Sequence, residues 1–223
     1  MTMTAAELVA SKKHILLDFD GPICAAFAGY GAANISRQLA TLMAMEGVVV
    51  PAKLFDSPDP FELLRYASTP GDPALLADVN AEFRRLEVQA VRFAPLTPDS
   101  REVVQRLANG GHSISIVSNN SAQAVERYAR IHQLTGFLAG INARCVDDPS
   151  FLKPNPHLLL DALRDRCATA GDAVMIGDSA SDIRAAQAAK VSSVAFVNRP
   201  TKRQRLLQSH PDAVITEMRQ LLF

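Results

Sequence analysis

The sequence predicts an α/β fold built around a mainly parallel sheet, with a small α-helical subdomain inserted into it. Short apolar runs rich in β-branched residues alternate with helical patterns over most of the 223 residues, and this alternation is typical of βα units. Residues 24–93 differ because they carry helical patterns and almost no strand alternation. We therefore expect a core domain formed by residues 1–23 and 94–223, and a helical subdomain formed by residues 24–93.

The composition is that of an ordinary globular protein, with 48% hydrophobic and 21% charged residues. Lysine plus arginine and aspartate plus glutamate both number 23, so no net charge would attract nucleic acid or an anionic membrane. No apolar run is long enough to cross a bilayer. The charges near the N-terminus follow a weakly apolar stretch, which is the reverse of a signal peptide. We expect a cytoplasmic protein, monomeric or homodimeric, that binds neither nucleic acid nor membranes.

The three cysteines, Cys24, Cys145 and Cys167, show no spacing typical of a metal site and are odd in number. We expect them to be reduced and to pack as small hydrophobic side chains.

Six segments are predicted to form strands. The first two contain few charges and are expected to lie centrally in the sheet, buried on both faces. The predicted strands are Ile15–Phe19, Ser113–Ser118, Ala173–Gly177, Ser193–Val197 and Ala213–Ile215, with a weaker one near Ile141.

Helical patterns lie between these strands and fill the inserted segment. In the core they cover residues 98–109, 156–166 and 182–190, and another helix is expected to begin near Ala122. In the insertion they cover residues 31–46, 59–67 and 73–92, separated by turns rich in proline and glycine. An insertion after the first strand would lie over the carboxyl end of that strand, where open α/β sheets bind ligands.

The first strand ends in two acids, Asp18 and Asp20, followed by Gly21 and Pro22. Two residues apart in an extended chain, both side chains would point to the same side. Two carboxylates at the end of a buried strand would repel each other and be costly to desolvate, so we expect a cation beside them. Solvated acids, or acids that cap the next helix, are the simpler alternative.

Polar residues also follow the second strand. The hydroxyl of Ser118 and the amide of Asn119 come where that strand turns into a helix, and such groups can bind an anion together with backbone N–H groups. Ser121 is expected to cap that helix. Farther along, Lys153 is held between apolar residues and two prolines, which limit where its ammonium can reach. By itself, a lysine just before a helix is more often a solvent-exposed side chain.

Asp178 and Asp182 follow the third strong strand and are four residues apart, so they share a face once a helical turn has begun. These carboxylates again call for a cation. Alternatively, Asp182 caps its helix and Asp178 stabilises the loop.

Together these residues all fall at strand ends or in the loops that follow, and parallel strands bring such ends to one edge of the sheet. Carboxylate ligands without clustered histidine or cysteine suit Mg²⁺. A lysine and a hydroxyl beside them suit a phosphate. The sequence therefore predicts a phosphoryl-transfer site.

The chain resembles the haloacid dehalogenase-like hydrolase superfamily, in its phosphatase branch with a helical cap, which includes phosphoglycolate phosphatase and β-phosphoglucomutase. The motifs that carry the resemblance occur in the family's order. They are Asp18-Phe19-Asp20-Gly21, then Ser118-Asn119, then Lys153-Pro154, then Gly177-Asp178-Ser179-Ala180-Ser181-Asp182. The resemblance implies a Rossmann-like, three-layer core with a small inserted cap.

The resemblance also implies roles for the acids. Asp18 would be the nucleophile that forms an aspartyl-phosphate, and Asp20 would be the acid and base. Mg²⁺ would be held by Asp18, the backbone carbonyl of Asp20 and Asp178. Asp182 would serve as a ligand or as a partner of the ligands.

The phosphoryl oxygens would be held by Ser118, Asn119 and Lys153. We expect a Mg²⁺-dependent phosphatase that hydrolyses a small phosphomonoester metabolite. A phosphomutase of the β-phosphoglucomutase type, a phospho-accepting signalling domain and a catalytically silent binding protein remain as alternatives. Arg37 and Arg65 of the cap are candidates for contact with an anionic substrate, although surface arginines are more often solvated.

Overall fold

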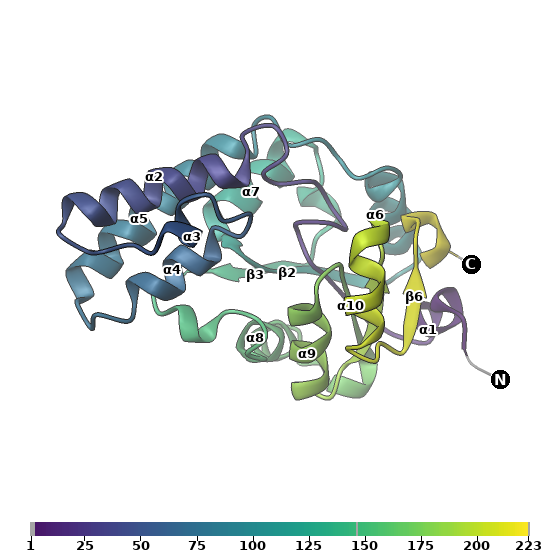
Figure 1. The fold of residues 1–223 in the computed structure, drawn as a ribbon. Coiled ribbons are helices and arrows are strands. Elements are labelled where there is room, and N and C mark those ends of the chain that lie inside the picture. Colours follow the sequence, from purple (N-terminus) through teal and green to yellow (C-terminus); the bar gives the residue numbers. More distant parts are fainter. Residues whose placement is uncertain (1–2, 146, 223) are drawn as a thin grey trace.

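A computed structural model of the chain, described here for residues 3–145 and 147–222, contains a six-stranded parallel sheet. The strand order is β3-β2-β1-β4-β5-β6, and both termini lie on the side of the molecule away from the cap helices (Figure 1). The strands are β1 (His14–Leu17), β2 (Ser113–Ser121), β3 (Gly140–Arg144), β4 (Ala173–Gly177), β5 (Ser192–Phe196) and β6 (Ala213–Ile215). Thus β1 and β2 have strands on both sides, as predicted.

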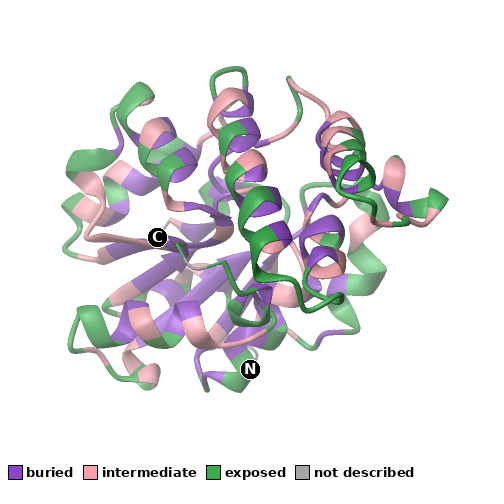
Figure 2. Ribbon diagram, turned by 90° about the vertical axis from the view of Figure 1, so that its left-hand side faces the viewer, coloured by how far each residue is buried: buried purple, intermediate pink, exposed green. Residues whose placement is uncertain are grey.

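Helices cover both faces of the sheet and form the three layers expected from the sequence. Alternate residues of a strand point to opposite faces, so Ile15 and Leu17 pack with α1, α6 and α7, whereas Leu16 packs with α8 and α9. In Figure 2 the strands are almost wholly buried, between helices that expose their outer faces. The helices are α1 (Ala5–Ala10), α6 (Ser100–Asn109), α7 (Ala122–Ile131), α8 (His157–Asp165), α9 (Ala180–Ala188) and α10 (Arg203–Leu207).

The cap helices build a second apolar core. They are α2 (Ala32–Met45), α3 (Ala52–Phe55), α4 (Phe61–Ala67) and α5 (Pro73–Ala90), and they lie together beside the sheet (Figure 1). Three rings pack in this core, with centroids 5.1 Å apart for Phe61 and Phe83 and 6.5 Å from Phe27 to each. The boundaries of the insertion at residues 24 and 93 stay a prediction.

The two connections between sheet and cap run side by side. Cys24 and Leu96 form an antiparallel bridge. The N–H of Ala25 donates to the carbonyl oxygen of Pro95 at 3.1 Å. The cap is therefore attached through a short hydrogen-bonded ribbon rather than through two independent linkers.

All predicted strands and helices are present; β4 and β6 have the predicted bounds, and the ends of most other elements are shifted. β1 stops at Leu17, two residues earlier than expected, because the N–H of Phe19 bonds the carboxylate of Asp18 at 2.8 Å. Helix α9 begins at Ala180, two residues early, because Ser179 is its N-cap. The alternative in which Asp182 is the N-cap is therefore wrong in position, although the Asp182 side chain takes part in the capping box by accepting from the N–H of Ser179. The helices α1, α3 and α10 were not predicted.

The cysteine prediction is correct only in part. All three thiols are free, and Cys24 is buried, but Cys145 and Cys167 are exposed and do not pack as core residues. No helix in the described ranges is long and apolar enough to span a bilayer.

Candidate active site

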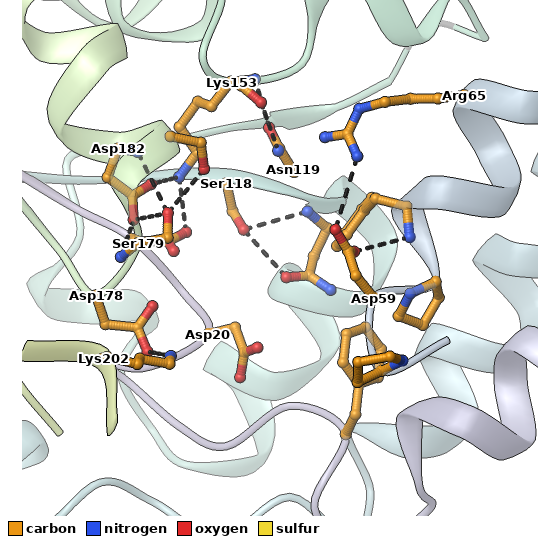
Figure 3. A pocket seen from close by; sticks show the side chains of 17 residues that line it. Asp20, Asp59, Arg65, Ser118, Asn119, Lys153, Asp178, Ser179, Asp182 and Lys202 are labelled. Carbon is orange, nitrogen blue, oxygen red and sulfur yellow. Dashed lines mark hydrogen bonds and ion pairs between the residues drawn. The ribbon is translucent and has the colours of Figure 1, made fainter. Parts of the chain in front are cut away.

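A cavity of about 220 Å³ opens at the carboxyl end of the sheet, between the core and cap helix α4. Figure 3 shows its lining. The side chains predicted from the sequence all line it: Asp18, Asp20, Ser118, Asn119, Lys153, Asp178 and Asp182. They come from the ends of β1, β2 and β4, the first turn of α9 and the loop before α8, so the parallel sheet brings them together as expected.

Three buried carboxylates form the centre of the site. One oxygen from each of Asp18, Asp178 and Asp182 lies within 4.8 Å of the others. Hard oxygen ligands at this spacing fit a Mg²⁺ ion. The backbone makes this approach possible at Gly177, where a Cβ atom would stand 2.4 Å from the side chain of Asp182.

Lys153 is the cation that the paired acids require, and its side chain is only 2% exposed. Its Nζ donates to Asp18 Oδ1 at 2.9 Å, to Asp182 Oδ1 at 2.6 Å and to the carbonyl oxygen of Val117 at 2.9 Å. These three bonds use all the donors of an ammonium group. Burial lowers the pKa of Lys153, but the two carboxylates raise it by a larger amount. The pKa is therefore above its usual value, and the group is charged.

The pKa values of the acids are raised. Burial, together with the charge of Asp182, raises the pKa of Asp18 to about 8. Burial and the charge of Asp178 raise the pKa of Asp20 to about 6, and the N–H of Ala26, which donates to Asp20 Oδ1 at 2.8 Å, opposes this rise. A carboxyl group that titrates near 6 suits proton transfer in both directions near neutral pH.

Asp182 has protein donors on both oxygens. Besides the bond from Lys153 to Oδ1, its Oδ2 accepts from the N–H of Ser179 at 3.0 Å and from the Ser179 hydroxyl at 2.6 Å. This arrangement fixes the helix start and the lysine at once.

Ser118 and Asn119 take different positions in the site. The Ser118 hydroxyl accepts from the N–H of Asn120 at 3.2 Å and donates to Asn120 Oδ1. Asn119 exchanges two bonds with the backbone of Lys153, accepting its N–H at 2.8 Å and donating to its carbonyl oxygen at 3.2 Å. The asparagine therefore fixes the lysine loop against the end of β2.

Two residues that follow β5 contact Asp178, and these contacts were not predicted. Asn198 donates to Asp178 Oδ2 at 2.6 Å, and Lys202 forms an ion pair with the same oxygen. Burial raises the pKa of Asp178, and Lys202 lowers it in part. The signal in the sequence was that both residues follow the predicted strand Ser193–Val197, which ends at the same edge of the sheet as the other site residues.

A buried polar network behind the site was also missed. Glu87 of α5 accepts from Arg144 of β3, from Asn120 Nδ2 at 3.1 Å and from the N–H of Ser121. The available signal was an acid on the apolar face of a helix, one turn after Phe83. Ser121 occupies the N-cap position of α7, which begins at Ala122, but its hydroxyl makes no capping bond, so the capping prediction is correct only for its position.

The cap contributes an acid and an arginine to the cavity wall. Arg65 lines the cavity, and its Nη1 lies 3.7 Å from Asp59 Oδ2. Figure 3 shows the two side chains pointing toward each other. Arg37 instead forms an exposed pair with Asp56 at 2.6 Å and does not line the cavity.

The model of the family described as haloacid dehalogenase-like hydrolase matches residues 56–196, more than half of the chain. The chain belongs to this family. The matched part of the haloacid dehalogenase-like chain includes Ser118, Asn119, Lys153, Asp178 and Asp182, whereas Asp18 and Asp20 precede it.

Two curated relatives are similar in sequence to part of this haloacid dehalogenase-like chain. Phosphoglycolate phosphatase of Aliivibrio fischeri is 34% identical over 131 residues, which are 59% of this chain and 57% of the relative. Pyrophosphatase PpaX of Bacillus mycoides is 33% identical over 122 residues, 54% of this chain and 55% of the relative. The chain therefore aligns with little more than half the length of either relative.

Solved structures of low identity share the fold over nearly the whole chain. A haloacid dehalogenase-like family hydrolase from Streptococcus pneumoniae has a TM-score of 0.66 at 17% identity, covering 94% of this chain and 96% of that chain. CbbY from Rhodobacter sphaeroides, solved in complex with phosphate, has a TM-score of 0.67 at 19% identity, covering 93% and 95%. These likenesses establish the architecture.

Proposed function

We propose that the protein is a phosphatase that hydrolyses a small phosphomonoester through a phosphorylated Asp18. The observation that carries this proposal is the convergence of the predicted acids, hydroxyl and lysine on one cavity. Family membership and the names of the two curated relatives support it. The cavity volume of about 220 Å³ favours a small substrate.

Asp18 is suited to the nucleophilic role because its two donors among the described residues share one oxygen. The N–H of Phe19 and the ammonium of Lys153 both donate to Oδ1, and Oδ2 has no donor among the described residues. In the first step a bond forms between a carboxylate oxygen of Asp18 and phosphorus, and the bond from phosphorus to the leaving oxygen breaks. Lys153 holds Asp18 in place and adds positive charge beside the incoming phosphate.

Asp20 would move the proton in both steps. It donates a proton to the leaving alkoxide, and it then removes one from the water that attacks the phosphorus of the intermediate, which regenerates Asp18. The Ser118 hydroxyl and the amide of Asn119, which line the same cavity, would bind phosphoryl oxygens. The two hydrogen bonds between the Asn119 side chain and the Lys153 backbone would also fix the position of Lys153.

Mg²⁺ is the metal that the donor set fits, held by Asp18 and Asp178, with Asp182 as a partner that positions the site. Both oxygens of Asp182 already accept protein hydrogen bonds, which favours the positioning role. When bound, the ion would offset the repulsion between the carboxylates and the phosphate.

The test is turnover of p-nitrophenyl phosphate by the wild type and by Asp18→Asn, with and without EDTA. We expect turnover with Mg²⁺ and at least a 1,000-fold loss in the variant or after chelation, on the order of what loss of a nucleophile costs. Asp78→Asn, on the exposed face of α5, is the matched control and should keep full activity. Full activity in a folded Asp18→Asn protein would refute the mechanism.

A panel of phosphometabolites and inorganic pyrophosphate then identifies the substrate class. A hexose 1-phosphate belongs in it, because release of free phosphate distinguishes a phosphatase from a phosphomutase, which would form the isomeric sugar phosphate instead.

A further inference from the structure

A second cavity, of about 390 Å³, adjoins the candidate active site at the mouth of the cleft between cap and core. It shares its lining residues Asp59, Arg65, Asp178, Ser179, Ser181 and Lys202 with the first cavity. The second cavity therefore lies next to the place where a ligand at Asp18 and Lys153 would bind. Figure 3 shows the shared wall, with Arg65 on the cap side and Lys202 on the core side.

Two arginines line only the second cavity. Arg184 is on α9 and Arg205 is on α10. Those two helices lie side by side (Figure 1) and are joined by packing of Ile183 against Leu206. The fold thus places both arginines beside this cavity, on helices of the core rather than on a loop.

The other cations of this cavity already have acidic partners. Lys202 pairs with Asp178, and Arg65 lies 3.7 Å from Asp59. Arg184 and Arg205 form no ion pair and donate no side-chain hydrogen bond to any residue of the ranges 3–145 and 147–222. Two guanidinium groups without partners, beside a cavity, retain all their donors for an anion, and their planar forks match phosphate and carboxylate oxygens.

We propose that Arg184 and Arg205 bind a second anionic group, a phosphate or a carboxylate, on the leaving group of the substrate. The proposal rests on the proposed phosphatase function, because it assigns the first cavity to the phosphoryl group that is transferred. The substrate class is then a phosphomonoester with an additional anionic group at its other end.

Glu62 on the cap wall of the same cavity supplies the competing explanation. Its Oε2 accepts from the Ser57 hydroxyl at 2.7 Å, and it has no cationic partner among the described residues. If the arginines served to attract Glu62 when the cap closes, they would strengthen the binding of every substrate equally. A subsite for an anion would strengthen the binding of only those ligands that carry the second anionic group.

The test measures binding with phosphonates, which the enzyme cannot hydrolyse, so its outcome does not depend on turnover. Titration calorimetry of the wild type with Mg²⁺ compares alkylphosphonates of three to six carbons with the α,ω-bisphosphonates and ω-carboxyalkylphosphonates of the same length. We expect at least one doubly anionic series to bind tenfold or more tightly than its matched alkylphosphonate. The series that gains identifies the second group as phosphate or carboxylate.

In the double variant Arg184→Gln/Arg205→Gln this tenfold advantage should vanish, while alkylphosphonate affinity and p-nitrophenyl phosphate turnover stay within twofold. Arg130→Gln, an exposed arginine on α7 that lines neither cavity, should keep the advantage. The proposal is overturned if no doubly anionic ligand gains in the wild type, if the gain survives in the double variant, or if the variant weakens both ligand types equally. If the wild type does not turn over p-nitrophenyl phosphate but still binds doubly anionic ligands more tightly, the proposed phosphatase function is refuted and the anion subsite is not.

Discussion

Glu87 of the cap helix α5 and Arg144 at the end of strand β3 form an ion pair at 2.5 Å with side chains 0% and 2% exposed. Arg144 also donates to Asn80 Oδ1 at 2.7 Å and to the carbonyl oxygen of Asn119 at 3.2 Å, and its guanidinium lies 4.8 Å from the centre of the Phe83 ring. One arginine thus connects the cap helix to the end of strand β2, which carries the expected phosphate ligand Asn119.

Arg144→Met should lower the free energy of unfolding by about 3–5 kcal/mol, because it leaves a buried carboxylate without its cation. Burial raises the pKa of Glu87, and Arg144 opposes this rise. The loss should therefore be smaller at pH 5 than at pH 8, since Glu87 can then be neutral. Urea unfolding at the two pH values measures this effect.

The control for that experiment is Arg164→Met. Arg164 pairs with Asp161 at 2.7 Å, but its side chain is 73% exposed, and exposed pairs contribute roughly 0–1 kcal/mol. An equal loss of stability in both variants would show that the buried pair has no special weight.

The metal-free protein should lose stability as the pH rises from about 4 to 8. The pKa values of Asp18 and Asp20 are raised to about 8 and about 6, so both groups bind protons more tightly in the folded state. Their contribution is complete below the unfolded pKa of about 4 and is lost as the pH passes through the folded values. Between pH 6 and 8 the contribution of Asp18 falls with a slope of at most about 1.4 kcal/mol per pH unit.

Mg²⁺ should reverse this trend, because it competes with protons for the same carboxylates. We expect its affinity, measured by calorimetry, to increase by up to about tenfold per pH unit between pH 6 and 8. Affinity that is constant over this range would contradict the raised pKa of Asp18.

Gly177→Ala should disrupt the site through steric conflict alone. A Cβ at Gly177 would stand 2.4 Å from Cβ of Asp182, and overpacking of this kind costs roughly 1–3 kcal/mol. It would also displace Asp182 from Lys153, so we expect kcat/KM for p-nitrophenyl phosphate to fall by at least tenfold. Gly171→Ala is the matched control just before the same strand. The added Cβ would meet only Thr169 Oγ1, at 3.8 Å. The Gly171→Ala substitution should therefore change neither stability nor activity appreciably.

The strands and their polar ends could be predicted from the sequence because both signals are local. The apolar run before Asp18 and the run before Asp178 each mark a buried strand, and the parallel arrangement then places their ends together. The same reasoning located Ser118. It also placed Lys153 in the site, although only the contacts with Asp18 and Asp182 show what fixes its ammonium.

The remaining features depend on contacts between distant segments. Nothing near Glu87 in the sequence indicates that Arg144, 57 residues away, supplies its charge. The position of Lys202 after a predicted strand places it near the same edge of the sheet, but only the fold shows that its partner is Asp178. Arg37 and Arg65 are indistinguishable in the sequence, and only the packing of α4 against the cleft gives Arg65 access to the cavity.

The ribbon that joins cap and core also carries the donor to Asp20. The N–H of Ala26, two residues beyond the bridge at Cys24, lowers the pKa of Asp20 through its hydrogen bond. Any rotation of the cap that draws Ala26 away removes this donor and makes Asp20 hold its proton more tightly. The pKa of Asp20 therefore depends on how the cap is oriented relative to the core, because the same ribbon carries the donor and connects the cap.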